Sequence, residues 1–180
     1  MRSKLFSIMA QGLHDARILA IALRSQRLGF VVTEGSIELV HWGMIYYEGN
    51  EEASIAAAMK RAQTLFARFA PSRVAIERSQ AARVPSRENL QFFYRRVRRE
   101  TSRRSIPVSM FTRIKVRSAF ADFGVRSKDE IAALLARMFP ELQPKLPPKR
   151  KLWKREHFSM PLFDAVALAV ACWRRDCFQE

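Results

Sequence analysis

Short apolar runs in the first part of the chain indicate three consecutive β-strands. They are expected at residues 17–24, 28–33 and 37–47, with Glu34 and Gly35 forming the turn before the third strand. Connections this short usually join antiparallel neighbours. The pattern therefore predicts an antiparallel meander.

The spacing of apolar residues becomes helical after these strands. Glu51 and Glu52 open a helix, where acidic side chains favour the positive end of the helix dipole. Apolar residues recur at helical spacing as far as Phe69, and Pro71 ends the helix. One side of this helix is expected to pack on the sheet.

Strands and helices alternate through the rest of the chain. The pattern predicts a strand at 74–76, a helix at 86–103, a strand at 106–110, helices at 115–123 and 128–139, and a last helix from about Pro161 through Trp173. This order predicts an α/β domain whose mixed five-stranded sheet, three antiparallel strands and then two parallel ones, is flanked by helices.

The length of 180 residues suits one domain. We expect residues 1–16 to be a loosely held leader, residues 17–180 to form the domain, and residues 140–157 to include a mobile basic loop, because 140–155 contains four prolines and six bases. No apolar run approaches the roughly 18 residues of a membrane helix, and the leader lacks a secretory pattern. We therefore expect a cytoplasmic protein without membrane association.

The net charge of +15 is concentrated in two segments. Residues 83–117 contain 11 Lys and Arg against two Glu, and residues 145–155 contain six bases and no acid. Confined positive charge attracts polyanions and releases counterions on binding nucleic acid. A basic surface that serves only solubility would not require this confinement.

The candidate nucleic-acid-binding residues lie in these two segments. They are Arg95, Arg96, Arg98, Arg99, Arg103, Arg104, Lys115, Lys149, Arg150, Lys151, Trp153, Lys154 and Arg155. Several of the arginines must share one exposed side of a helix, where they can contact successive phosphates. Trp153 either stacks on an unpaired base or anchors its loop to the core.

Two carboxylates stand where chemistry is expected. Glu77 follows a buried strand, at the sheet edge where open α/β folds place ligands, and Asp164 lies in the first turn of the last helix. Each has a structural alternative: Glu77 can pair with a nearby arginine such as Arg78, and Asp164 can favour the helix dipole.

Several segments together resemble the RuvC branch of the RNase H-like superfamily. They are residues 18–25 followed by Gly29-Phe30, residues 74–77, residues 115–123 followed by 128–131, and residues 163–169. The resemblance covers about residues 17–173. It implies a two-metal nuclease for branched DNA in which Glu77 and Asp164 are catalytic and bind Mg²⁺ or Mn²⁺.

The chain departs from the family pattern at two acidic positions. The family's first-strand aspartate falls on Ala22, and a further acid falls on Pro161, neither of which has a side-chain oxygen. Glu156 and His157 are the better candidates for replacement ligands, because they precede the last helix by a few residues. The remaining candidates are Asp15 and Glu34.

Three functions fit these residues. The leading interpretation is a RuvC-like protein that recognises branched or structured DNA with a degraded two-metal site. The alternative is an active Mg²⁺-dependent Holliday-junction-type endonuclease with substitute ligands, and a third is a scaffold for an acidic protein. RNA remains a possible ligand. The resemblance also implies a homodimer, for which exposed aromatics such as Phe92 are candidate contacts.

Overall fold

The computed structural model describes residues 16–24, 27–35, 38–78, 85–148 and 156–178. Its strands are β1 (Ile18–Arg24), β2 (Arg27–Glu34), β3 (Glu38–Tyr46), β4 (Arg73–Glu77) and β5 (Val108–Phe111). The expected leader lies almost wholly outside the described residues, as do residues 149–155 of the expected basic loop.

The five strands form one mixed sheet in the order β3-β2-β1-β4-β5. β1 pairs antiparallel with β2, and β2 pairs antiparallel with β3. β4 is parallel to both β1 and β5. The predicted sheet of three antiparallel strands followed by two parallel ones is therefore confirmed.

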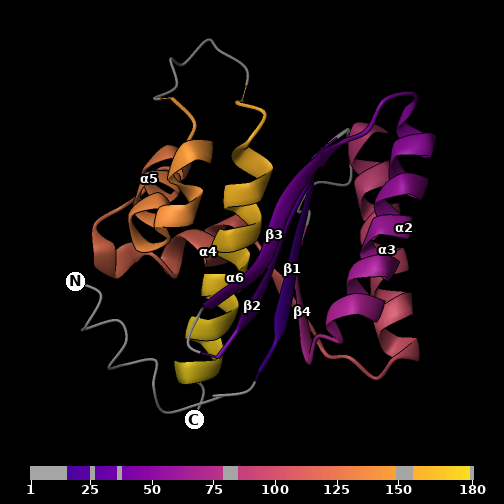
Figure 1. Cartoon of the computed structure of the whole chain (residues 1–180), viewed down its shortest axis with the longest axis horizontal. Coiled ribbons are helices and arrows are strands. Elements are labelled where there is room, and N and C mark those ends of the chain that lie inside the picture. Colours follow the sequence, from indigo (N-terminus) through magenta and orange to yellow (C-terminus); the bar gives the residue numbers. More distant parts are fainter. Residues whose placement is uncertain (1–15, 25–26, 36–37, 79–84, 149–155, 179–180) are drawn as a thin grey trace.

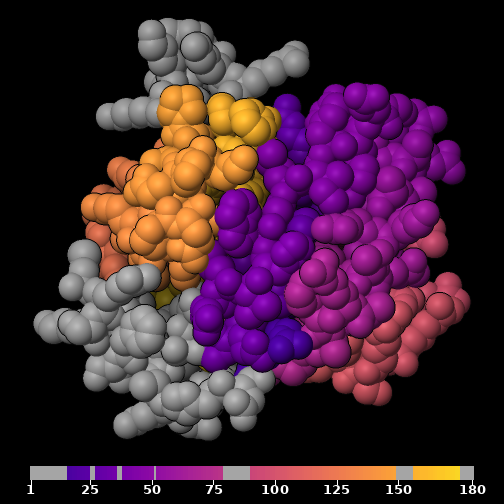
Figure 2. All heavy atoms as spheres, in the orientation of Figure 1, coloured from indigo at the N-terminus to yellow at the C-terminus, as the bar shows by residue number. Residues whose placement is uncertain are grey.

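Helices cover both faces of this sheet (Figure 1). α2 (Glu51–Phe69) and α3 (Pro85–Arg103) lie on one face, and α4 (Arg113–Ser118), α5 (Lys128–Met138) and α6 (Met160–Phe178) lie on the other. In the space-filling view, the surfaces of α5 and α2 are separated by β3 (Figure 2). None of the described helices is both long and apolar enough to cross a bilayer.

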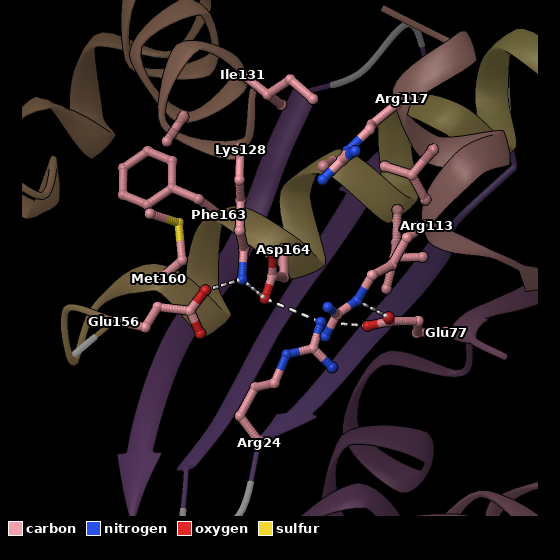
Figure 3. A pocket seen from close by; sticks show the side chains of 14 residues that line it. Arg24, Glu77, Arg113, Arg117, Lys128, Ile131, Glu156, Met160, Phe163 and Asp164 are labelled. Carbon is pink, nitrogen blue, oxygen red and sulfur yellow. Dashed lines mark hydrogen bonds and ion pairs between the residues drawn. The ribbon is translucent and has the colours of Figure 1, made fainter. Parts of the chain in front are cut away.

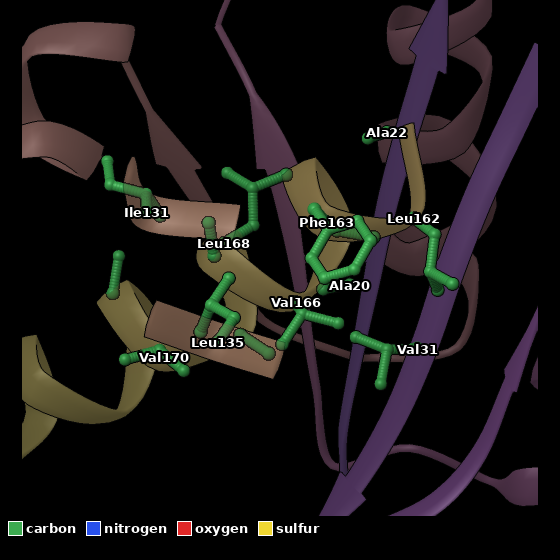
Figure 4. Packing of buried hydrophobic residues seen from close by; sticks show 14 of the residues in the cluster. Ala20, Ala22, Val31, Ile131, Leu135, Leu162, Phe163, Val166, Leu168 and Val170 are labelled. Atoms are coloured by element: carbon green, nitrogen blue, oxygen red, sulfur yellow. The ribbon is translucent and has the colours of Figure 1, made fainter. Parts of the chain in front are cut away.

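Strand alternation divides the core into two clusters. On β1, Leu19, Ile21 and Leu23 pack against α2 and α3, whereas Ala20 and Ala22 pack against α6. Small side chains on the second face let α6 approach the sheet, as the packing of buried residues shows (Figure 4). Arg24 follows Ala22 by two residues and so belongs to the α6 face.

The far end of α6 is also fixed to the sheet. The buried Trp173 donates a hydrogen bond from Nε1 to Thr33 Oγ1 at 3.3 Å. At the other end of α6, Gly29 on β2 lies directly against the backbone of Pro161. The helix is thus held against β2 along most of its length.

Two of the expected elements differ from the structure. β5 begins at Val108, because Pro107 has no N–H and Ile106 donates its N–H to Thr101 in the turn after α3. The helix expected at 115–123 is two pieces, α4, capped by Thr112, and the 3₁₀-helix η1 (Ala121–Phe123). Gly124, which follows η1, has a φ of +69°, a backbone conformation that favours glycine.

The start of the expected basic loop is ordered instead. Pro140–Lys145 forms the 3₁₀-helix η2, and its Leu142 side chain is fully buried beside α5. The prediction of a mobile loop was therefore wrong for this part, because apolar burial outweighed the proline content. Residues 149–155 of that loop lie outside the described residues.

Candidate functional site

Glu77 and Asp164 come together at one end of the sheet. Glu77 ends β4 on the face that α6 covers, since Ala75, two residues earlier, packs in the α6 cluster. Asp164 is the fifth residue of α6, so the expectation that it lies in the first turn was wrong, because the helix already begins at Met160. Both side chains line one pocket, together with Glu156 from the segment before α6 (Figure 3).

Two basic side chains lie between these carboxylates. The guanidinium of Arg24, at the end of β1, pairs with Glu77 through a short contact and with Asp164 at 3.1 Å. The Nζ of Lys128, the first residue of α5, lies 2.8 Å from Asp164 and also pairs with Glu156. A continuous chain of ion pairs therefore connects the carboxylates, and we call these five residues the ion-pair network.

Burial and charge act in opposite directions on this network. Burial alone would lower the pKa of Arg24, but Asp164 and Glu77 raise it above its usual value. Burial raises the pKa of Glu77, but Arg24 and Arg113 outweigh burial and hold it below its usual value. Burial also raises the pKa of Asp164, and there Arg24 and Lys128 offset only part of the effect.

Glu77 has a second partner on α4. Arg113 Nε lies 2.9 Å from Glu77 Oε1, while the Arg113 side chain is 68% exposed. The structural alternative for Glu77, an ion pair with an arginine, is therefore correct in kind but wrong in its partner. Arg78 is exposed, and Glu77 pairs with Arg24 and Arg113 instead.

The expected replacement ligands have different outcomes. Glu156 lies near Asp164, but the Nζ of Lys128 lies between the two carboxylates and pairs with both. His157 Nδ1 lies 2.8 Å from Ser159 Oγ. Glu34 lies at the opposite end of β2 from the network, where it pairs with Arg17 at 2.6 Å, so its candidacy was wrong.

Asp15 lies outside the described residues. Within the described part of the chain, no three His, Cys, Asp or Glu side chains form a group that could hold a metal ion.

Sequence reasoning missed the basic half of the site. Arg24, Arg113, Arg117 and Lys128 all line the pocket, yet none was singled out as a ligand of the carboxylates. One signal was available for Lys128, because a cation in the first turn of a helix is unfavourable with the helix dipole and suggests another partner. A second signal was available for Arg24, because this charged residue lies at the end of a buried strand and on the same face as Ala22.

The arginines of α3 form a separate surface. Five of the candidates lie on this helix and all are exposed, namely Arg95, Arg96, Arg98, Arg99 and Arg103. Arg104, the first residue after α3, is also exposed, pairs with Glu100 at 2.9 Å and lies over the ring of Phe66. Because α3 covers the sheet face opposite α6, this surface and the pocket belong to different layers.

The remaining candidates divide between described and undescribed regions. Lys115 is exposed on α4, next to the helix residues that reach the pocket. The other candidate bases and the aromatic residue lie outside the described residues, namely Lys149, Arg150, Lys151, Trp153, Lys154 and Arg155. The exposed Phe92 of α3 is 46% accessible, with Arg96 over its ring.

The pH dependence of stability offers a test of the ionised state of Glu77. Because the folded-state pKa of Glu77 is below 4.5, its ionisation stabilises the fold above pH 4.5, and this contribution disappears as pH falls through the folded pKa. Calorimetric melting should show Glu77→Gln less stable than the wild type at pH 7, with the difference shrinking below pH 4.5.

The control for this measurement is the same change at the exposed Glu141 on η2. The stability of Glu141→Gln should differ little from that of the wild type at neutral pH. A Glu77→Gln deficit that stays constant down to pH 3 would contradict the assigned pKa shift.

Comparison with known proteins gives matches only to solved structures. No family model matches the chain, and no curated protein matches it in sequence. Thermus thermophilus RuvC in complex with a Holliday junction substrate superposes with a TM-score of 0.66 and 17% identity, over 89% of this chain and 94% of that one. A second Thermus thermophilus RuvC structure gives 0.64 and 19%, over 88% and 95%.

A eukaryotic structure shares the same architecture. The yeast mitochondrial Holliday junction resolvase Ydc2 superposes with a TM-score of 0.56 and 13% identity, over 97% of this chain and 86% of that one. These likenesses extend over nearly the whole chain. The chain therefore has the RuvC-like form of the RNase H-like fold, as the sequence predicted.

Proposed function

We propose that this protein recognises branched or structured DNA without cutting it, because its two-metal nuclease site has been replaced by a network of ion pairs. The observation that carries the proposal is the position of Arg24 and Lys128. Arg24 bridges Glu77 and Asp164, and Lys128 bridges Asp164 and Glu156. Positive side chains thus stand between the carboxylates that a metal would need.

The donor set does not fit a pair of Mg²⁺ ions. Magnesium requires near-octahedral oxygen ligands at about 2.0–2.1 Å, and two-metal sites hold their ions about 3.5–4 Å apart. Here the carboxylates are engaged by fixed cations that would repel a divalent ion. Ala22, fully buried on the same strand face as Arg24, contributes no oxygen. We therefore derive no metal-dependent step for this protein.

Binding to DNA is supported by charge and by fold. The net charge of +15 favours association with a polyanion, and the exposed arginines of α3 offer contacts to successive phosphates. One of the structurally similar proteins is a RuvC bound to a Holliday junction substrate. A branched DNA is accordingly the first ligand to test.

One observation favours an active endonuclease as the second candidate. Three carboxylates, Glu77, Glu156 and Asp164, line a single pocket. If DNA binding displaced Arg24 and Lys128, these oxygens would become available to Mg²⁺ or Mn²⁺. This alternative requires two buried or half-buried cations to leave their partners, which is costly.

A binding and cleavage experiment separates the two candidates. Fluorescence anisotropy should show that the protein binds a four-way junction more tightly than a duplex with the same number of nucleotides. At matched ionic strength, its affinity for the junction should be equal in EDTA and in Mg²⁺. Gel analysis of the same samples in Mg²⁺ or Mn²⁺ should show intact junctions. Equal binding to junction and duplex would contradict the recognition of branched DNA.

Controls are needed to identify the source of any cleavage. Glu77→Gln and Asp164→Asn remove the negative charge while nearly preserving side-chain size. Junction cleavage that both substitutions abolish would establish the endonuclease and refute the proposal. Cleavage that survives in both variants would indicate a contaminating nuclease, and the wild type would then be scored as inactive.

A further inference from the structure

The pocket beside the ion-pair network has more positive than negative side chains. Its charged lining consists of four bases, Arg24, Arg113, Arg117 and Lys128, and three acids, Glu77, Glu156 and Asp164. The hollow has a cavity volume of about 100 Å³, which is below the range of about 300–1,000 Å³ found for small-ligand sites. A hollow of this size suits a small group such as one phosphate rather than a whole nucleotide.

The three acids already have basic partners. Arg24 and Lys128 neutralise the buried part of the network, and Arg113 adds a second ion pair to Glu77. Arg117 makes no ion pair with any residue that the structure describes, and its guanidinium points toward the pocket from α4 (Figure 3). The pocket is left with one positive charge in excess.

The apolar part of the lining strengthens interactions made here. Val116, Ile131, Phe163 and Leu168 form part of the wall. Ion pairs and charged hydrogen bonds are stronger beside apolar groups than in open water, because the local dielectric is lower. An anion bound in this pocket would therefore interact more strongly with Arg117 than one bound on the exposed surface.

We propose that the pocket binds one backbone phosphodiester of the nucleic acid directly through Arg117 and Arg113, so that protein cations and not metal ions contact the phosphate oxygens. This inference rests on the proposed function and identifies a phosphate contact within it. A phosphodiester carries one negative charge and so balances the excess. Guanidinium groups also match phosphate oxygens in a bidentate geometry.

Arg113 can serve both partners. Its contact to Glu77 uses Nε, and the side chain remains 68% exposed, so its terminal nitrogens can reach a second anion. A terminal phosphate monoester is the less suitable ligand, because its second charge would meet Glu77 and Asp164 without a compensating base. The site thus favours an internal phosphate of a chain over a free end.

The first test uses junction binding by charge-neutral variants. Arg117→Gln should weaken binding by about tenfold and reduce the slope of log affinity against log salt by about 0.9. Arg137→Gln makes the same change on the outer side of α5, where the arginine is exposed and does not line the pocket. Equal losses for the two variants would overturn the inference.

The second test does not depend on junction recognition. The dinucleotide dTpdT and its neutral methylphosphonate analogue differ mainly in the charge of one phosphate. In NMR of the full chain, dTpdT should shift the Arg117 and Arg113 Nε–H signals, and the analogue should leave them in place. Absence of a shift at millimolar dTpdT, or equal shifts with both compounds, would overturn the inference.

The two proposals can fail separately. If the wild type prefers junctions and Arg117→Gln behaves as Arg137→Gln does, the phosphate site is wrong and the proposed function stands. If junction and duplex bind equally but dTpdT shifts the arginine signals, the site stands and the recognition of branched DNA is wrong. Thermal melting of each variant confirms that these exposed positions leave the fold intact.

Discussion

Arg24→Met should destabilise the folded protein by about 3–5 kcal/mol, the usual cost of removing one partner from a buried ion pair. The side chains of Glu77 and Asp164 are only 10% and 13% exposed, so water can replace the lost guanidinium only in part. Methionine keeps much of the chain length of arginine and therefore tests the charge more than the packing. Denaturant unfolding at pH 7 measures the loss.

A second substitution distinguishes charge from packing in this experiment. Adding Glu77→Leu to Arg24→Met removes one of the two buried carboxylates that lose the guanidinium, and should recover part of the lost stability. Arg137→Met, at an exposed position of α5, should change stability by less than about 0.5 kcal/mol. If Arg24→Met is no more harmful than that control, the ion-pair network does not stabilise the fold.

Gly29→Ala should cost about 3 kcal/mol and displace the start of α6. A Cβ on Gly29 would lie 2.0 Å from the carbonyl oxygen of Pro161 and 2.5 Å from the backbone nitrogen of Leu162, so backbone atoms must move. Asp164 lies in the same turn and would move with them. Denaturant unfolding gives the stability, and NMR shift changes around Arg24 report the displacement.

Gly43→Ala provides the matched control for this change. Its added Cβ would meet the ring of Phe30 at 2.8 Å, and a side chain can turn more easily than a backbone can shift. We expect a loss of about 1 kcal/mol there. Equal losses of stability for Gly29→Ala and Gly43→Ala would show that the backbone of β2 and the start of α6 are not in close contact.

The order of elements could be predicted from the sequence because it depends on local pattern. The alternation along β1 separates the residues facing α2 and α3 from those facing α6, and the helical spacing after Glu51 predicts α2 almost to the residue. Boundaries failed where one residue outweighed the pattern. Because Pro107 has no N–H, β5 begins at Val108, later than predicted. Because Leu142 is buried, the proline-containing segment that was predicted to be a loop forms η2.

The positions of the two acids were also accessible from sequence. Glu77 was placed at a strand end and Asp164 at a helix start, and both line the same pocket. The basic residues that meet them were not identified. Local pattern assigns a residue to a face and to an end of an element, but it does not say which distant side chains converge there.

The sequence by itself determined the mixed sheet, the concentration of positive charge and the absence of side-chain oxygens at Ala22 and Pro161. Only the tertiary structure decided what stands between the acids. Arg24 and Glu77 are 53 residues apart, and Lys128 and Glu156 are 28 apart. Ion pairs act through space over a few ångströms, so their partners are chosen by how β1, β4, α5 and α6 pack and not by spacing along the chain.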